Sequence, residues 1–510
     1  MKNTIKLTLA LLAIGFVSCE PEFDTPVDEN GFFTNGEADF STYVAVGNSL
    51  TAGFADNALY RSGQMNSYPN IMAQQFELVG GGEFTQPLVD DNLGGLLLNG
   101  TQITNNRLVL SVNGANRAPV LLAGTPTTEI TASAVGPFNN MGVPGAKSFH
   151  LIAPGYGSVA GISAGASNPY FARFATSESA TVIEDAVSLN PTFFTLWIGN
   201  NDILGYATSG GAGVDQTGNL DPTSYGGSDI TDPNVFASVY SQEVEALTGN
   251  GAKGALVNIP DVTSIPYFTT VPLNAIPLDA ATAGALNAQF AAYNNQILPG
   301  LVQFQVITAQ EAASRKITFM AGQNFPILTD DDLTNIAPVL QGPPFNLPAQ
   351  TAGLLGQLRQ VNSNDLIVLT AASVLGTTPD PANPTGVIGV SIPLQDQFVL
   401  TAKEQARVQT AANAYNATIQ GLAAANDLAF VDARAALSQV ANGGFAFDGG
   451  SISSTFGTGG AFSLDGVHPT PRGYAYTANV IIDAINRKYN ATVPKVNIGN
   501  YTTITASNNP

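Results

Sequence analysis

Residues 43–53 read YVAVGNSLTAG, and this stretch decides how the rest of the chain is interpreted. The apolar run over 43–46 predicts a short buried strand that ends at Gly47. A turn of small residues follows and brings Ser49 to the carboxyl end of that strand, the edge at which open α/β sheets bind ligands. Taken alone, Ser49 fits a turn or helix-capping role as well as a nucleophile.

Further strand-like and helix-like segments alternate downstream. Apolar runs at 192–198, 255–259 and 429–431 predict strands, and 67–76 and 470–488 have helical spacing. Strands that alternate with helices at this spacing predict an α/β fold of three layers, in which helices cover both faces of a mostly parallel sheet.

The longest expected helix spans residues 401–424. One apolar stripe recurs along it at helical spacing. The stripe consists of Val408, Ala412, Tyr415, Ile419 and Leu422.

Long insertions interrupt this alternation. Residues 80–137, 205–232 and 320–398 are rich in Gly, Thr, Asn and Pro, and we interpret them as loop insertions into one domain over 39–492. Residues 493–510 are expected to form a C-terminal tail.

The amino terminus has the features of a secretion signal. Lys2 and Lys6 precede a short apolar run over 7–17, and Ser18 precedes Cys19, the single cysteine of the chain. This pattern resembles a bacterial lipoprotein signal, which would make 1–18 a signal peptide and Cys19 the lipidated residue. The resemblance implies export across the inner membrane and anchoring, most simply in the outer membrane, on its periplasmic face or at the cell surface. The alternative is an ordinary signal peptide in which the cysteine occurs by chance.

The residues after Cys19 and the overall charge narrow the choice of partners. Residues 19–38 are acidic and contain Pro and Gly, so a flexible tether is expected. The 38 acidic residues outnumber the 18 lysines and arginines, which argues against nucleic acid as a partner and against electrostatic docking on anionic membranes. No thiol remains after Cys19 for a disulfide or a thiolate metal site.

The chain has two histidines, His150 and His468. His468 lies in the stretch SLDGVHP at 463–469, three residues after Asp465. A carboxylate at this spacing can hold the imidazole from its Nδ1 side and leave Nε2 free to take a proton from a hydroxyl. An Asp-x-x-His pattern is weak evidence alone, because a loop histidine is usually just solvated.

Two more short stretches contain amide groups that are able to donate a hydrogen bond to an oxyanion. The run WIGNND at 197–202 follows an apolar strand, and its Asn201 amide is able to donate to a developing oxyanion. The run NMGVPG at 140–145 ends in Gly145, whose backbone N–H would be unobstructed. Either stretch alone is also an ordinary turn or helix cap.

Together these motifs resemble the ordered sequence blocks of the SGNH/GDSL hydrolase family. Ser49 matches the block I serine, Gly145 the block II glycine, Asn201 the block III asparagine, and Asp465 with His468 the block V pair. The resemblance covers most of residues 40–490 and is thin in the three insertions. At one place the chain departs from the pattern, since asparagine precedes Ser49 where aspartate is usual.

The resemblance implies a flavodoxin-like α/β/α sandwich without metal or organic cofactor. It implies a Ser49–His468–Asp465 triad and an oxyanion hole made by the Ser49 N–H, the Gly145 N–H and the Asn201 side chain. We therefore expect a serine ester hydrolase acting on an acylated lipid or acylated glycan through an acyl-enzyme. The alternative is a surface lipoprotein that binds glycans on a hydrolase scaffold with little or no catalysis. The sequence does not fix the oligomeric state.

Other residues compete for chemical roles. Ser163 lies in a G-x-S-x-G stretch typical of α/β-hydrolases, but no strand-like run precedes it, so a chance match is favoured. His150 has no visible partner and is expected to be a loop residue. The acidic run 330–332 suggests either a calcium site or, preferably, the amino terminus of a helix.

Overall fold

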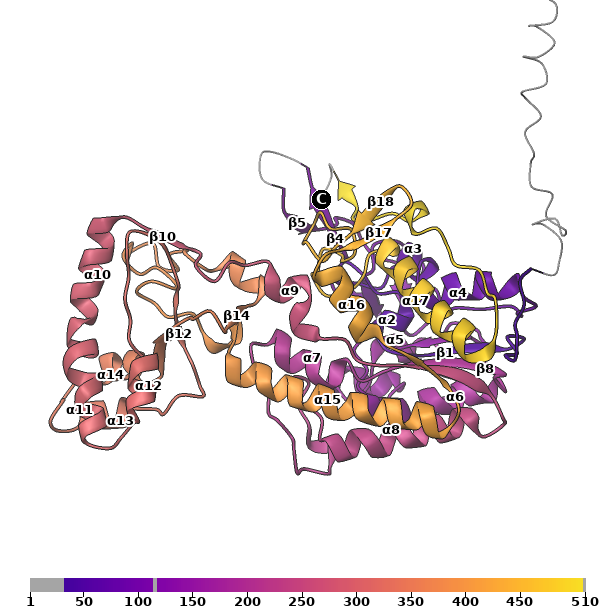
Figure 1. The fold of residues 1–510 in the computed structure, drawn as a ribbon, viewed down its shortest axis with the longest axis horizontal. Coiled ribbons are helices and arrows are strands. Elements are labelled where there is room, and N and C mark those ends of the chain that lie inside the picture. Colours follow the sequence, from indigo (N-terminus) through magenta and orange to yellow (C-terminus); the bar gives the residue numbers. More distant parts are fainter. Residues whose placement is uncertain (1–31, 113–116, 508–510) are drawn as a thin grey trace, which may run out of the picture.

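The computed structural model describes residues 32–112 and 117–507. Its centre is a five-stranded, wholly parallel sheet in the order β7-β1-β8-β9-β16 (Figure 1). The strands are β1 (Tyr43–Gly47), β7 (Asn140–Gly142), β8 (Phe193–Trp197), β9 (Lys253–Val257) and β16 (Ala429–Val431). Numbered along the chain, the order is 2-1-3-4-5, the flavodoxin-like doubly wound order. The expected α/β class and parallel sheet are therefore confirmed.

Helices cover both faces of the sheet, as the alternation of strands and helices predicts. One face carries α4 (Tyr68–Glu77), α16 (Ala433–Ala441) and α17 (Pro471–Tyr489). The opposite face carries α6 (Val182–Ser188), α7 (Asn201–Thr208), α8 (Pro233–Thr248) and α15 (Ala402–Ala425). The helices expected at 67–76, 401–424 and 470–488 correspond to α4, α15 and α17.

Helix α15 illustrates why these segments are helical. Thr401 and Glu404 form a capping box at its start, which satisfies amide groups that have no partner within the helix. Val408, Tyr415 and Ile419 of the expected stripe are buried against the sheet and α8. Leu422 is only half-buried, because the neighbouring Ala423 takes the innermost position at the end of the helix.

The first two expected insertions lie against the sheet domain. Residues 80–137 contain the short strands β2 (Leu96–Leu98), β3 (Thr101–Gln102), β4 (Leu108–Ser111), β5 (Pro119–Leu121) and β6 (Thr128–Glu129). Val89, Leu96 and Ile130 of this region form a small core with Ala52, close to Ser49 in the chain. The region at 205–232 begins within α7 and continues as a loop to Ile230.

The third region is a subdomain with its own hydrophobic core, formed by residues between Ile276 and Val390 (Figure 1). It starts well before the insertion expected at 320, because helical residues from 280 onward pack into this second core rather than on the sheet. Its elements are β10 (Ile276–Leu278), α10 (Ala280–Ala292), α11 (Leu298–Gln303), α12 (Ala309–Ser314), β11 (Gly322–Asn324), β12 (Ile327–Thr329), α13 (Ala337–Gln341), α14 (Ala349–Leu355) and β13 (Leu358–Gln360).

The preferred interpretation of residues 330–332 as a helix start is wrong. The segment is a turn, and the next helix, α13, begins at Ala337. Asp330 pairs with the buried guanidinium of Arg359, and Asp332 pairs with Arg407. Among the described residues there is no group of three or more metal-binding side chains suited to an ion.

Both ends of the described chain pack against the sheet domain. Residues 34–37 hydrogen-bond to the end of α17 and to Thr492, so the last part of the expected tether lies against the sheet domain. Within the expected tail, β19 (Ala506–Ser507) pairs with β4. Cys19 and the signal peptide lie outside the described residues. No helix among those described is long and apolar enough to cross a membrane.

Candidate active site

Ser49 is placed by a tight turn at the carboxyl end of β1. It opens the short helix α2 (Ser49–Ala52), and the Asn48 side chain accepts the Leu50 N–H at 3.1 Å as the cap. The turn requires glycine at position 47, because a Cβ atom there would lie 2.3 Å from Thr51 Oγ1 and 2.4 Å from the Trp197 carbonyl oxygen. The close packing of β1 on β8 thus fixes the orientation of the start of α2 and the position of the Ser49 hydroxyl.

The tertiary structure brings Ser49, His468 and Asp465 together. His468 Nε2 lies 2.9 Å from Ser49 Oγ, and His468 Nδ1 lies 2.9 Å from Asp465 Oδ2. Phe54, just after α2, packs on the imidazole at a ring distance of 4.7 Å. The three groups therefore form a continuous hydrogen-bonded chain through which the serine proton can pass to the imidazole.

Asp465 is held as an ionised carboxylate. Its Oδ1 accepts from Ser463 Oγ and from the backbone N–H groups of Val467 and His468, and its Oδ2 accepts from His468 Nδ1 and the Asn57 N–H. Burial alone would raise the pKa of this carboxyl. The His468 charge and these hydrogen bonds outweigh burial and lower the pKa to about 2.

Residues that the sequence did not suggest support this loop. Asp56 Oδ1 accepts the Leu464 N–H at 3.0 Å, and the Asp56 N–H donates to Ser463 Oγ at 2.9 Å. Asp56 and Asn57 both adopt positive φ, 53° and 63°. Aspartate and asparagine tolerate this conformation better than most residues, so an adjacent Asp-Asn pair in the sequence is a signal for a turn of this kind. The segment after α2 thereby fixes the Asp465 loop relative to the nucleophile.

Of the expected oxyanion donors, Asn201 lines the same cavity as Ser49, and Gly145 follows the strand that pairs with β1. Gly145 follows β7 with φ of +82°, and Asn201 begins α7, the helix after β8. The Asn201 Nδ2 donates to the Ala146 carbonyl at 2.8 Å, which ties α7 to the Gly145 loop and leaves the second amide hydrogen available. The backbone N–H groups of Ser49 and Gly145 have no acceptor within the described part of the chain.

Asp202 accepts hydrogen bonds from the loop that contains Gly145. Its buried carboxylate accepts from the backbone N–H of Ser148 at 2.9 Å and from the Ser148 hydroxyl at 2.7 Å. Burial raises the pKa of Asp202, and the bonds from Ser148 act in the opposite direction. Asp202 therefore positions the Gly145 loop and does not line the cavity at Ser49.

The competing residues lie elsewhere. Ser163 is exposed in a 3₁₀ segment, Val159–Ala164, and the element directly before it is another 3₁₀ segment, not a strand. His150 lies in another 3₁₀ segment, where its Nδ1 accepts the Lys147 N–H and its ring stacks on Tyr156. Burial, with a smaller effect of the Lys147 charge, lowers the pKa of His150 to about 4. Neither residue makes a hydrogen bond to the Ser49–His468–Asp465 group.

A cavity of about 120 Å³ opens beside Ser49 and His468. It continues between the carboxyl ends of β8, β9 and β16 and the helices α16 and α17, and its walls are mainly apolar. Ser49 follows β1 and Asn201 follows β8, the neighbouring strands at which the chain changes direction across the sheet. Ligands of doubly wound folds bind at this topological switch point.

No family model, no curated protein and no solved structure matches this chain.

Proposed function

We propose that this chain is a serine ester hydrolase of the SGNH/GDSL type that cleaves carboxylic esters through an acyl-enzyme. The observation that carries the proposal is the hydrogen-bonded chain from Ser49 Oγ through His468 to Asp465, with 2.9 Å at each step. The supporting observation is that Asn201 lines the same cavity as Ser49 and hydrogen-bonds to the loop of Gly145, at the switch point of a sheet with the flavodoxin-like strand order.

The proposed reaction follows from the roles of these groups. Ser49 Oγ attacks the ester carbonyl while His468 Nε2 takes its proton, and the Asp465 carboxylate stabilises the imidazolium that forms. The Ser49 and Gly145 N–H groups and the Asn201 amide donate to the oxyanion. The imidazolium then protonates the leaving alcohol, and water activated by the same imidazole cleaves the acyl-enzyme and releases the acid.

The test is hydrolysis of p-nitrophenyl acetate and butyrate by the soluble chain from residue 20. Ser49→Ala is expected to abolish turnover and labelling by a serine-directed fluorophosphonate. Ser163→Ala, the matched control, is expected to retain both. Loss of activity only in Ser163→Ala would move the nucleophile to the G-x-S-x-G segment, and absence of both turnover and labelling in the wild type would refute the proposal.

The glycan-binding alternative receives no support from the surface near Ser49. Such a role would favour exposed aromatic side chains around the site. In the part of the chain that the structure describes, the strongly exposed phenylalanines are Phe32, Phe33, Phe304 and Phe325, and none of them lines the cavity at Ser49.

We further propose, from the sequence of residues 1–19, that the mature chain is anchored to a membrane through a lipidated Cys19. Two or more buried acyl chains give stable anchoring, because each buried methylene contributes about 0.8 kcal/mol. Metabolic labelling with an alkyne fatty acid is expected to mark the wild type and not Cys19→Ala. Absence of label from both would leave an ordinary secretion signal, and equal labelling of both would place the lipid on another residue.

A further inference from the structure

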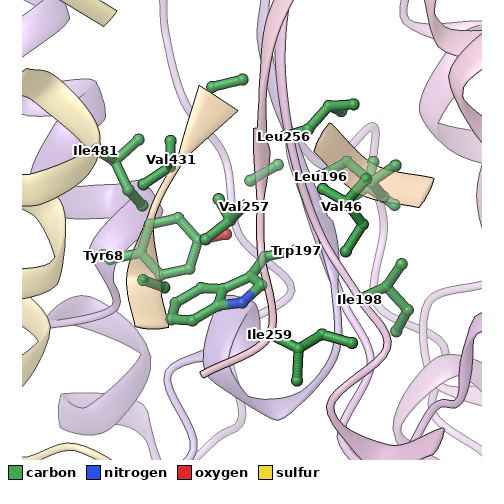
Figure 2. Packing of buried hydrophobic residues seen from close by; sticks show 14 of the residues in the cluster. Val46, Tyr68, Leu196, Trp197, Ile198, Leu256, Val257, Ile259, Val431 and Ile481 are labelled. Atoms are coloured by element: carbon green, nitrogen blue, oxygen red, sulfur yellow. The ribbon is translucent and has the colours of Figure 1, made fainter. Parts of the chain in front are cut away.

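The cavity beside Ser49 has a polar part and an apolar part. Ser49, Asn201 and His468 line its polar part. Val257, Val431 and Ile481 line its inner part, where each side chain is at most 1% exposed. Figure 2 shows Val257 next to Trp197, and Val431 and Ile481 near the ring of Tyr68 in the same region of the core. The cavity therefore leads from the nucleophile into the interior of the sheet domain.

The polar side chains of the lining lie mainly beside Ser49, and those on α17 are already hydrogen-bonded. Tyr476 and Thr477 on α17 also line the cavity, but their hydroxyls donate to the carbonyls of Ala436 and Gly473. Within the described chain, the buried amide atoms of the lining without a hydrogen-bond partner are Asn48 Nδ2, directly after β1, and Asn200 Oδ1, in the turn between β8 and α7. The inner part thus offers an apolar group only van der Waals contact, and a charged or hydroxylated group would lose its hydration there without compensation.

The volume limits how much of a substrate fits. An apolar cavity of roughly 150 Å³ admits a benzene-sized group, so one of about 120 Å³ admits somewhat less. We propose that this cavity receives the acyl part of the substrate and selects unsubstituted, uncharged acyl groups of about four to six carbons. The inference rests on the proposed ester hydrolase function and adds the substrate class to it.

The chain-length profile tests the inference on the wild type. Each methylene that enters an apolar cavity contributes about 0.8 kcal/mol, which corresponds to about 4-fold in kcat/KM. We expect kcat/KM to rise about 15-fold from p-nitrophenyl acetate to butyrate, to reach its maximum at butyrate or hexanoate, and to fall at least 10-fold by decanoate. A flat profile, or a maximum at acetate or decanoate, would overturn the inference.

Two positions on α16 provide a matched pair of variants. Ala436 is half-buried and lines the cavity, whereas its neighbour Ala435 is exposed. Ala436→Phe is expected to lower the ratio of kcat/KM for hexanoate to that for acetate at least 10-fold, because the ring takes the space of the acyl chain. Ala435→Phe is expected to leave the ratio unchanged. Equal ratios in Ala436→Phe, Ala435→Phe and wild type would overturn the inference.

An enlarging variant covers the case in which Ala436→Phe fails to fold. Leu437 lines the same wall, and Leu437→Ala is expected to shift the best substrate toward octanoate. An unchanged optimum in folded Leu437→Ala would contradict the acyl pocket while the ester hydrolase function stood. If the wild type hydrolyses no ester and takes up no fluorophosphonate, the hydrolase function and the acyl pocket both fall.

Discussion

Replacing Asp465 by asparagine should remove most of the activity without removing the fold. The Oδ1 site of Asp465 faces three donors, so the amide oxygen of the new side chain is expected to occupy it. The amide nitrogen then faces the Asn57 N–H and His468 Nδ1. Because an amide NH₂ only donates, His468 must present Nδ1 as an acceptor and carry its proton on Nε2. In that tautomer Nε2 donates to Ser49 and cannot accept its proton.

The expected loss is about 10⁴-fold in kcat, or about 5.4 kcal/mol of transition-state stabilisation. The new amide NH₂ at position 465 and the Asn57 N–H then face each other with no acceptor between them. This should also lower the free energy of unfolding by about 1–3 kcal/mol. The assay is p-nitrophenyl butyrate hydrolysis beside thermal unfolding, with Asp221→Asn, in an exposed turn, as control. If a folded Asp465→Asn variant kept kcat within 10-fold of wild type, Asp465 would not set the tautomer of His468.

Three further predictions concern the oxyanion donors, a buried acid and the subdomain. Asn201→Ala should lower kcat about 10²–10³-fold in ester hydrolysis assays, with a smaller change in KM, if its amide binds the oxyanion. Glu243 is fully buried and has no hydrogen-bond partner among the described residues, and burial raises its pKa well above the usual range. The free energy of unfolding should therefore fall as pH rises above the ordinary glutamate pKa, by up to about 1.4 kcal/mol per pH unit until the folded-state pKa is reached. Urea unfolding from pH 5 to 8 should show that slope in the wild type and a flatter one in Glu243→Gln. Arg359→Met should destabilise the subdomain by about 3–5 kcal/mol, because Asp330 and Asp365 lose their buried partner, and limited proteolysis between 276 and 390 would detect this.

The parts of the fold that the sequence predicted are those with a strong local signal. Long apolar periodicity identified α15 and α17, and continuous apolar runs identified β1, β8 and β16. Strand β9 begins at Lys253, two residues before the expected start, because element ends depend on pairing with neighbours. Strand β7 has only three residues and is strand mainly through its register with β1, so no local pattern revealed it.

The regions that the sequence did not resolve lack such a signal. The subdomain between Ile276 and Val390 has a separate core, and helical spacing does not say which of two cores a helix packs into. The acidic run at 330–332 was interpreted from its charge alone, whereas its arginine partners come from positions 359 and 407. Side chains this far apart in the sequence come into contact only in the folded structure, so local sequence preferences do not identify them as partners.

The sequence by itself determined the α/β class and the candidate groups, because strand and helix periods are local and because two histidines left little choice of base. It could not set the distances on which the chemistry depends. Ser49 and His468 are 419 residues apart in the chain, and only the packing of β1, α2 and the Asp465 loop brings their atoms within 2.9 Å. The same holds for the cavity, whose walls come from β8, β9, β16, α16 and α17. Its shape is a property of close-packed side chains from distant segments, which no local pattern encodes.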